Sequence, residues 1–428
     1  MKLLKSSLLK TTGVYTISTF FNAGLPFLLL PILSHYLLPA EYGLVAMFIL
    51  LQNIAYPLVS LNVSTAIGKR KYYDESETDY GTYIGNSILL SLWAFIVVAV
   101  LFIPFRNLIA EATSVPVLWI YVAIITAWFY GIIQIRLTLW QFKEMPKKFA
   151  IMQVAYTLAK LLVSLLLVVL FTYGWEGRVF SIFISTLFLG IYSFYLLKKQ
   201  EGISFNFKKE NIVHAFKYGA PIIPHALAGF AIAYTDRIMI NSMISLEMMG
   251  LYSVAYQLSS VFGIATTAFN MAFIPWLYKN LKISTTNPEN SHQVVRVTYL
   301  TMIALVVAFV VLIFALPFAY SLLSDGYSGS QTFLFYLLLG FMFNGMYYLF
   351  CNYLFYTEKT AKISLITILS AIINIPLTYW LIKKNGALGA AQATVLVNMC
   401  TFIGTWIIAQ SEFPMPWFSK KAFSFKKN

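Results

Sequence analysis

The sequence is poor in charge and in cysteine. Of its 428 residues, 11% are charged, whereas 59% are hydrophobic and 17% are aromatic. A soluble domain has about 25% charged residues, so this chain has too few charges to cover a water-facing surface. Its two cysteines, Cys351 and Cys400, lie in apolar stretches far from any histidine cluster, which excludes a disulfide framework and a zinc site. The composition therefore indicates a polytopic membrane protein, and it excludes a soluble enzyme, a disordered chain and a secreted disulfide scaffold.

Long apolar runs recur along the chain. A helix that crosses the hydrocarbon core of a bilayer needs about 20 mostly apolar residues. Twelve runs have this character: 12–35, 42–67, 83–104, 116–140, 149–172, 178–197, 216–244, 250–276, 295–320, 331–356, 361–382 and 386–409. The first run is too long for a signal peptide and has no cleavage site after it, so we interpret it as a retained helix. The predicted fold class is an all-α polytopic membrane protein with twelve transmembrane helices.

The positions of the basic residues predict the orientation. With twelve crossings, 23 of the 30 Lys and Arg residues fall on the side of the N-terminus, four fall on the opposite side and three lie inside spans. Because Lys and Arg concentrate in cytoplasmic loops, we expect both termini in the cytoplasm and the chain in the cell (inner) membrane. This distribution accounts for most of the formal charge of +14, so no nucleic-acid partner is expected.

Short motifs recur in the two halves of the chain at nearly constant spacing. The pairs are 207 to 214 residues apart and keep the same order along the chain: Tyr42-Gly43-Leu44 with Met249-Gly250-Leu251, Gly131 with Gly345, Glu144-x-x-x-Lys148 with Glu358-x-x-x-Lys362, and Gly174-x-x-Gly177 with Gly386-x-x-Gly389. They predict two six-helix lobes, residues 1–210 and 211–428, related by an internal repeat around a central cavity. Parallel-repeat transporters that rock about a central site have this organisation.

Polar residues recur at steps of three and four along most predicted spans, which places them on one face of each helix. Asn53, Gln153, Asn270 and Asn374 are members of such stripes. A single stripe is explained by hydrogen bonds between helices, each contributing about 0.6 kcal/mol. Stripes in most spans favour a water-filled lumen, so we expect these four residues to contact a polar substrate.

Two basic residues in the first half are candidate anion contacts. Lys160 lies 11 residues into its predicted span, close to the middle of the membrane. A Lys at that depth costs about 2.5–3.5 kcal/mol on insertion scales, so it should face a cavity or a partner. We favour contact with an anion in the lumen, with a structural ion pair as the alternative. Arg136 lies nearer the cytoplasmic end, where snorkelling to the interface and substrate binding are both open.

The seventh predicted span contains two prolines and three titratable residues. Pro221 and Pro224 cannot donate backbone hydrogen bonds and predict a kink. His225 and Asp236 are three helical turns apart and share a face. Asp236 and His225 are the candidates for coupling to H⁺ or Na⁺. For Asp236, pairing to a cation on another helix is the alternative. Arg237 is a further candidate substrate contact, unless it snorkels to the outer interface. No nucleotide-binding loop or catalytic constellation is present, so we expect no enzyme activity, no metal and no cofactor.

Two stretches carry a resemblance to a known family. LLLPILSHYLLPAEYGLVAMF (28–48) and TDRIMINSMISLEMMGLYSVAYQL (235–258) resemble the polysaccharide-exporter branch of the multidrug/oligosaccharidyl-lipid/polysaccharide (MOP) superfamily, the Wzx-type O-antigen and related flippases. The resemblance implies translocation of undecaprenyl-diphosphate-linked oligosaccharide to the outer leaflet by alternating access, through a cationic cavity between two six-helix lobes. The partners that it implies are the lipid-linked oligosaccharide, the bilayer, and the glycan polymerase with its chain-length machinery.

The charges inside the spans agree with an anionic substrate. A diphosphate needs cations, and Lys160, Arg136 and Arg237 outnumber the single deep acid, Asp236. The main alternative is a cation-coupled multidrug antiporter of the same superfamily, which would need acidic residues in the lumen. A membrane-embedded glycan polymerase or ligase is disfavoured because every predicted outer loop is short.

Overall fold

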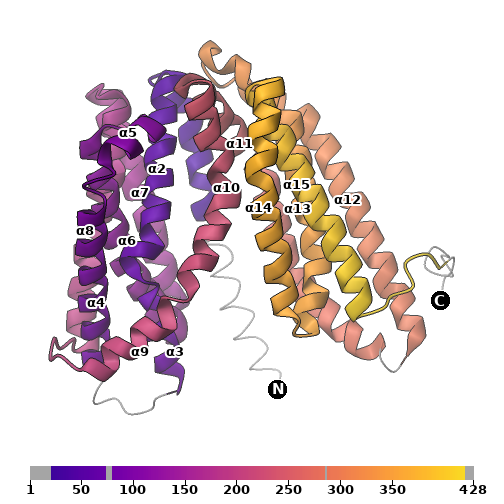
Figure 1. Ribbon diagram of the computed structural model, residues 1–428, viewed down its shortest axis with the longest axis horizontal. Coiled ribbons are helices and arrows are strands. Elements are labelled where there is room, and N and C mark those ends of the chain that lie inside the picture. The colour runs from indigo at the N-terminus through magenta and orange to yellow at the C-terminus, as the bar shows by residue number, and fades with distance from the viewer. Residues whose placement is uncertain (1–20, 74–79, 285–286, 420–428) are drawn as a thin grey trace. The chain divides into compact units, whose positions relative to one another are not determined.

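The computed structural model describes residues 21–73, 80–284 and 287–419, and every regular element in these ranges is a helix (Figure 1). The elements are α2 (Pro39–Ser60), α3 (Val63–Tyr73), α4 (Tyr80–Leu101), α5 (Arg106–Thr113), α6 (Val117–Phe142), α7 (Pro146–Ser164), the π-helix η2 (Leu165–Leu170), α8 (Gly174–Glu201), α9 (Lys209–Gly219), α10 (Ile222–Met243), α11 (Leu246–Ser284), α12 (Pro288–Tyr320), the 3₁₀ helix η3 (Asp325–Ser330), α13 (Gln331–Tyr356), α14 (Thr360–Asn385) and α15 (Ala387–Glu412). Within these described ranges, ten helical segments are long and apolar enough to cross a membrane. The predicted all-α, multi-span class is confirmed for the described residues.

Two of the twelve predicted spans are not among these ten segments. The described part of the first is the shorter apolar helix Phe21–Ser34, and the rest of it lies outside the described residues. The seventh is divided between α9 and α10, and the C-terminal half of α10 contains Asp236, Arg237 and Asn241. The count of twelve therefore stays a prediction.

The predicted kink at Pro221 and Pro224 is a complete break. α9 ends at Gly219, and Pro221 is the N-cap of α10. A Cβ atom on Gly219 would lie 2.0 Å from the carbonyl oxygen of Leu61, so only glycine allows this approach of the two backbones. Proline removes the hydrogen bond that would have continued the helix.

The span predicted over 42–67 corresponds to α2, but the helix does not continue to residue 67. α2 ends at Ser60, and Leu61 and Asn62 have φ values of +46° and +49° before α3 begins at Val63. The left-handed conformation is uncommon for residues with a Cβ atom, and the backbone N–H and hydroxyl of Thr65 stabilise it here by donating to the Asn62 carbonyl at 3.1 and 2.6 Å. Hydropathy does not reveal the break, because every residue around it is compatible with a span.

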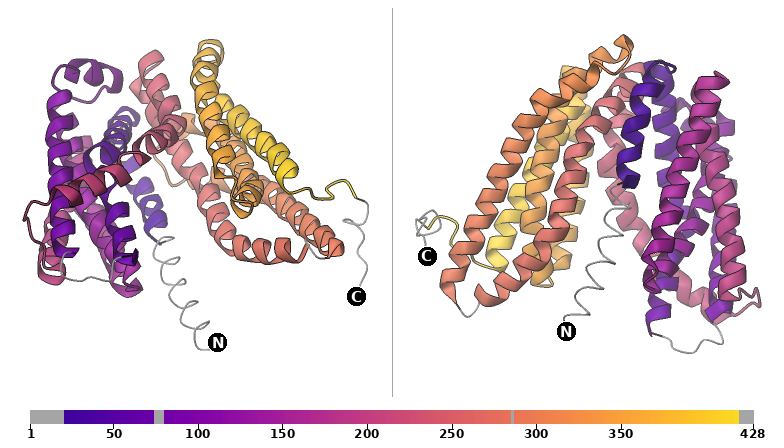
Figure 2. Two further views of the ribbon diagram at one scale, coloured as in Figure 1. Left: turned by 60° about the horizontal axis from the view of Figure 1, so that its bottom comes forward. Right: turned by 180° about the vertical axis from the view of Figure 1, so that it is seen from behind.

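The chain packs as two compact units, residues 1–250 and 251–428, which we describe separately. In the first unit α6 is the central helix, with α2, α3, α4, α7 and α8 packed around it (Figures 1 and 2). One face of α6 joins a hydrophobic cluster with α3, α4 and α9, and another face joins a second cluster with α7 and α8. The α6 residues in the first cluster are Ile132, Ile135 and Leu139, and those in the second are Ile133, Leu137 and Trp140.

In the second unit α13 packs against α12, α14 and α15. The segment after α15 returns to this bundle and inserts Trp417 among the aromatic rings of Phe350, Tyr353 and Trp406. The Trp417 indole N–H donates to Gln410 Oε1 at 2.7 Å, and its side chain is buried. An aromatic cluster thus closes one end of the second unit.

The boundary between the two units along the chain falls within α11, after Gly250. α9 packs on α3 and α4, and α10 packs on α2 and α5, so both helices belong to the first unit. The predicted division into 1–210 and 211–428 concerns internal similarity rather than packing, and it stays a prediction.

Two of the predicted repeat pairs share an unusual backbone conformation. Glu144, between α6 and α7, has φ +53°, and Glu358, between α13 and α14, has φ +60°. Gly174 and Gly386, at the starts of α8 and α15, have φ +55° and +61°. Since a positive φ is found in only a few per cent of non-glycine residues, the match between Glu144 and Glu358 is the more informative of the two, and the internal repeat stays a prediction.

Gly250→Ala tests the close contact between the starts of α2 and α11 in the first unit. A Cβ atom on Gly250 would lie 1.8 Å from the carbonyl oxygen of Pro39 and 3.1 Å from the backbone nitrogen of Gly43. We expect a loss of at least about 1–3 kcal/mol, the usual cost of overpacking, measured as a lower melting temperature in detergent. Gly404→Ala is the control, because a Cβ atom there meets nothing within 4 Å. Equal melting temperatures for the two variants would contradict the predicted clash.

Candidate functional site

Two half-buried basic residues inside the spans of the first unit have no carboxylate within ion-pair distance among the described residues: Lys160 of α7 and Arg178 of α8. They lie side by side, since Nη1 of Arg178 donates to the Lys160 carbonyl oxygen at 3.4 Å and to Ser181 Oγ at 3.5 Å. Both side chains are half-buried. An unneutralised pair of cations at this depth is costly without an anion or water, so these two residues are the strongest candidate ligands for an anion.

Lys160 is held against an aromatic ring. Its ammonium nitrogen lies 4.1 Å from the ring centroid of Tyr156, one turn earlier on α7, which is a cation–π contact. The Tyr156 hydroxyl is 2.9 Å from Thr186 Oγ1, and Thr186 in turn donates to the Ile182 carbonyl. Tyr156 is therefore the donor, and α8 positions the ring on which Lys160 lies.

Tyr156 is the last of three tyrosines, from three helices, that we call the tyrosine row: Tyr56 of α2, Tyr130 of α6 and Tyr156 of α7. The ring centroids of Tyr56 and Tyr130 are 5.2 Å apart, and those of Tyr130 and Tyr156 are 6.0 Å apart. Rings that combine an apolar face with a hydroxyl suit sugars, which present both C–H faces and hydroxyls. The row ends at Lys160, so the aromatic rings lie directly beside a cationic group in this unit.

Two predicted stripe residues lie beside the tyrosine row. Gln153 is three residues before Tyr156 and seven before Lys160, which places all three on one face of α7. Its buried Oε1 has no hydrogen-bond partner in the part of the chain that the structure describes. Asn53, one turn before Tyr56, donates to the Tyr234 hydroxyl of α10 at 2.8 Å.

Asp236 and Arg237 of α10 are both buried. The Asp236 carboxylate accepts the backbone N–H of Arg237 at 2.8 Å, whereas the guanidinium lies 3.9 Å away and donates to the Ala233 carbonyl instead. This agrees with the prediction that neighbouring residues on a helix pair poorly. Arg237 does not snorkel outward, because its guanidinium points back along α10 toward the Tyr234 ring. His225 lies in the first turn of α10, and its side chain falls outside the described structure.

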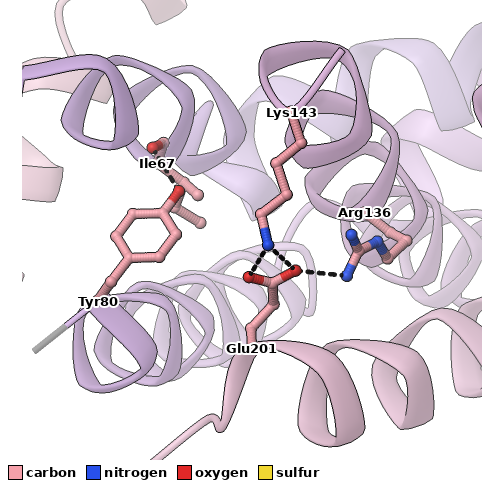
Figure 3. A network of polar contacts seen from close by, with 5 residues as sticks. All are labelled: Ile67, Tyr80, Arg136, Lys143 and Glu201. Atoms are coloured by element: carbon pink, nitrogen blue, oxygen red, sulfur yellow. Dashed lines mark hydrogen bonds and ion pairs between the residues drawn. The ribbon is translucent and has the colours of Figure 1, made fainter. Parts of the chain in front are cut away.

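Arg136 lies between the two hydrophobic clusters on α6 and has an acidic partner. Its Nη1 is 3.0 Å from Glu201 Oε1, and Lys143 Nζ is 2.7 Å from Glu201 Oε2 (Figure 3). The side chains of Arg136 and Glu201 are 1% and 3% exposed, so no face of this pair is open to a ligand. Neither of the two alternatives that the sequence left open, snorkelling and substrate binding, describes Arg136, since Glu201 neutralises it within the protein. Arg136 therefore lies outside the binding site proposed below.

Sequence reasoning missed Glu201 and its counterpart in the second unit. Glu201 ends α8, and Glu412, 211 residues later, ends α15. Glu412 forms ion pairs with Lys362 and Lys359 at the start of α14. The spacing, close to that of the repeat motifs, is the signal that could have identified both acids. Arg178 was missed because it lies at the edge of its predicted span and was counted as a loop residue.

The two predicted stripe residues of the second unit have partners inside it. Asn270 of α11 accepts a hydrogen bond from Asn352 Nδ2 of α13 at 2.7 Å. Asn374 of α14 is buried and accepts from the Thr378 hydroxyl at 3.0 Å. Hydrogen bonding between and within helices accounts for both residues, and their contact with a substrate stays a prediction.

Comparisons with known proteins identify a family for this chain. A family model described as polysaccharide biosynthesis protein matches residues 8–281. A Haemophilus influenzae protein described as Lsg locus putative protein 1 is 24% identical over 386 residues, which cover 87% of this chain and 90% of that protein.

Solved structures share the fold. An inward-facing multidrug resistance MATE family transporter of the MOP superfamily superposes with a TM-score of 0.71 at 14% identity, over 92% of this chain and 94% of that chain. The lipid II flippase MurJ in an inward closed conformation superposes with a TM-score of 0.62 at 15% identity, over 93% and 88% of the two chains. The resemblance to the MOP-superfamily polysaccharide exporters is confirmed.

Glu201→Gln tests the buried ion pair of the first unit. Removing one partner of a buried pair leaves an uncompensated charge and costs about 3–5 kcal/mol, so we expect a large fall in melting temperature and in the yield of folded protein. The matched control is Glu412→Gln. The lysine partners of Glu412 are 45% and 52% exposed, so the loss of this ion pair should cost about 1 kcal/mol or less. Equal effects of the two substitutions would show that burial does not distinguish the two pairs.

Proposed function

Because the chain belongs to the polysaccharide biosynthesis protein family, we propose that it flips undecaprenyl-diphosphate-linked oligosaccharide units from the cytoplasmic to the outer leaflet for surface polysaccharide synthesis. The chain has the fold of MOP-superfamily transporters, and the proposal adds transport and its substrate. The observation that carries it is the pairing of Lys160 with Arg178 inside the spans, without a carboxylate partner among the described residues, at the end of the tyrosine row.

The chemistry of this substrate requires both parts of the site. A sugar hydroxyl that enters hydrocarbon without a hydrogen bond costs about 4–8 kcal/mol on alkane scales. Hydroxyl and amide groups of the tyrosine row, Gln153 and Asn53 would replace water around the glycan. Lys160 and Arg178 would bind the diphosphate through charge-assisted hydrogen bonds, while the polyprenyl chain remains in the lipid.

The membrane potential supports outward movement of such an anion. With an inside-negative potential, transfer is favoured by about 2.3 kcal/mol per charge per 100 mV. The proposed transport therefore proceeds by alternating access without nucleotide hydrolysis.

The proposal includes the finer predictions made from the sequence. The chain crosses the membrane twelve times, with Phe21–Ser34 and α10 as the two crossings beyond the ten long helices. The twelve helices form two six-helix lobes around a central cavity. Both termini lie on the cytoplasmic side of the inner membrane, and the protein cooperates with a glycan polymerase. Coupling to H⁺ or Na⁺ through Asp236 also belongs to it.

Lys160→Ala and Arg178→Ala should each reduce surface glycan display in a strain that depends on this protein. A hydrogen bond to a charged group contributes about 1.5–3 kcal/mol, so we expect a reduction of at least tenfold, with a partial recovery in Lys160→Arg. Immunoblotting of surface polysaccharide, normalised to the amount of membrane-inserted protein, measures the effect. Lys383→Ala, an exposed lysine in the last turn of α14, is the control.

The same variants separate the proposal from the multidrug antiporter of the same superfamily. Unchanged glycan display together with altered drug resistance in Lys160→Ala would refute the flippase and support the antiporter. An organic cation would be repelled by Lys160 and Arg178, so the antiporter also predicts stronger drug export in Arg178→Ala.

Asp236→Asn tests ion coupling with little change in side-chain volume. The amide can still accept the Arg237 backbone N–H, but it cannot bind or release a proton at physiological pH. We expect transport in proteoliposomes to lose its dependence on an imposed pH or sodium gradient. Asp325→Asn, an exposed acid at the start of η3, is the control. An unaltered gradient dependence in Asp236→Asn would remove this residue from the mechanism.

A further inference from the structure

The short helix α9 has one face that is fixed to the first unit. Asn211, Ala215 and Gly219 are four residues apart, lie on one line along the helix and are buried. Asn211 accepts a hydrogen bond from Arg70 at 3.3 Å, Ala215 belongs to the hydrophobic cluster with α3 and α4, and Gly219 lies against Leu61. The position and rotation of α9 are therefore set by packing.

The segment 202–208 that leads into α9 is held equally firmly on α4. A Cβ atom on Gly81 or Gly85 would lie within 2.4 Å of the carbonyl oxygens of Gly202 and Ser204. The buried Asn86 amide donates to the Asn206 carbonyl at 2.9 Å and accepts the backbone N–H of Lys208 at 3.0 Å. We call residues 202–219 the α9 strap.

The outward side of the α9 strap carries large apolar side chains. Four large hydrophobic side chains are exposed on it: Phe205, Phe207, Val213 and Phe216. Phe207 is 71% exposed. Because the backbone beneath them is fixed by Asn86 and by the buried face of α9, these side chains cannot turn inward without breaking that packing. Such a rigidly presented apolar surface marks a site of contact.

Basic residues surround these aromatic side chains. The lysines of the strap and of the adjoining last turn of α8 are Lys198, Lys199, Lys208, Lys209 and Lys217. Of the acids in the same stretch, Glu201 is paired with Arg136 and Lys143, which leaves Glu210 as the exposed one. The surface is thus both apolar and cationic.

The place of the strap in the fold identifies its partner. It begins where the membrane span α8 ends, and α9 lies across the ends of α3 and α4 rather than along them (Figures 1 and 2). At such a level the bilayer presents the boundary between headgroups and acyl chains, where amphipathic helices with Lys on the polar side bind anionic lipids.

We propose that the α9 strap is an interfacial anchor that binds anionic phospholipid headgroups. Phe207 and Phe216 enter the acyl boundary, and Lys209 and Lys217 contact the headgroup phosphates. In the orientation that the basic residues predict, this is the cytoplasmic leaflet.

Lipid titration of the purified full-length protein tests the proposal. Lys209→Gln with Lys217→Gln is compared with Lys383→Gln and Lys384→Gln, an equally charged pair of exposed lysines at the end of α14. Binding of phosphatidylglycerol, counted by native mass spectrometry, should weaken by roughly 10- to 30-fold in the α9 pair, as two lysine–headgroup contacts are lost, and by less than threefold in the control pair. Equal effects in both pairs, or no effect in the α9 pair, would overturn the proposal.

Hydrogen exchange provides a second measurement that does not depend on the variants. In nanodiscs, amides of residues 209–218 should exchange more slowly in phosphatidylcholine with 30% phosphatidylglycerol than in phosphatidylcholine alone, while those of α13 stay unchanged. Phe207→Ala with Phe216→Ala should remove most of this difference. Identical exchange in the two lipids, as expected if the surface serves a protein partner instead, would contradict the anchor.

Discussion

The buried ion pair of Arg136 with Glu201 is the constraint on which the first unit depends. Arg136 lies on the central helix, α6, between two hydrophobic clusters, where an unpaired guanidinium would be very costly. Glu201 neutralises it and thereby fixes the end of α8 beside α6. Directly afterwards Gly202, with φ +62°, ends α8, and the chain turns onto α4 to begin the α9 strap. One carboxylate thus determines the course of the chain that follows it.

The second unit contains a more exposed version of this arrangement. Glu412 ends α15 as Glu201 ends α8, and its partners Lys359 and Lys362 lie at the start of α14. The left-handed residues Glu144 and Glu358 form the turn that precedes α7 in one case and α14 in the other. The same arrangement of an acid at a helix end with basic partners therefore contributes differently to the stability of the two units, because water screens the second ion pair and not the first.

The cations inside the spans differ in function although their residue types are alike. Arg136 has a buried acid, Arg237 binds a carbonyl of its own helix, and Lys160 and Arg178 lie together on the tyrosine row without a carboxylate among the described residues. The proposed function assigns the last two to an anionic substrate. Depth in the predicted span correctly marked Lys160 as unusual. It could not show that Arg136 is neutralised, because the acidic partner of Arg136 lies 65 residues away in the chain. It also left Arg178 out of the candidate ligands, because Arg178 lies in the first turns of α8.

The sequence by itself determined the all-α membrane class and most of the spans, because hydropathy acts within one helix and needs no partner. It also indicated an irregularity at Pro221, predicted as a kink, since proline alters its own helix, and the family, since motifs are local. Tertiary structure alone decided the break at Leu61 and Asn62, the pairing of Arg136 with Glu201, and which polar stripes are satisfied between helices, as Asn270 is by Asn352. Each of these depends on a neighbour distant in the chain, and the free energy of a buried polar group is set by that neighbour rather than by its own sequence context.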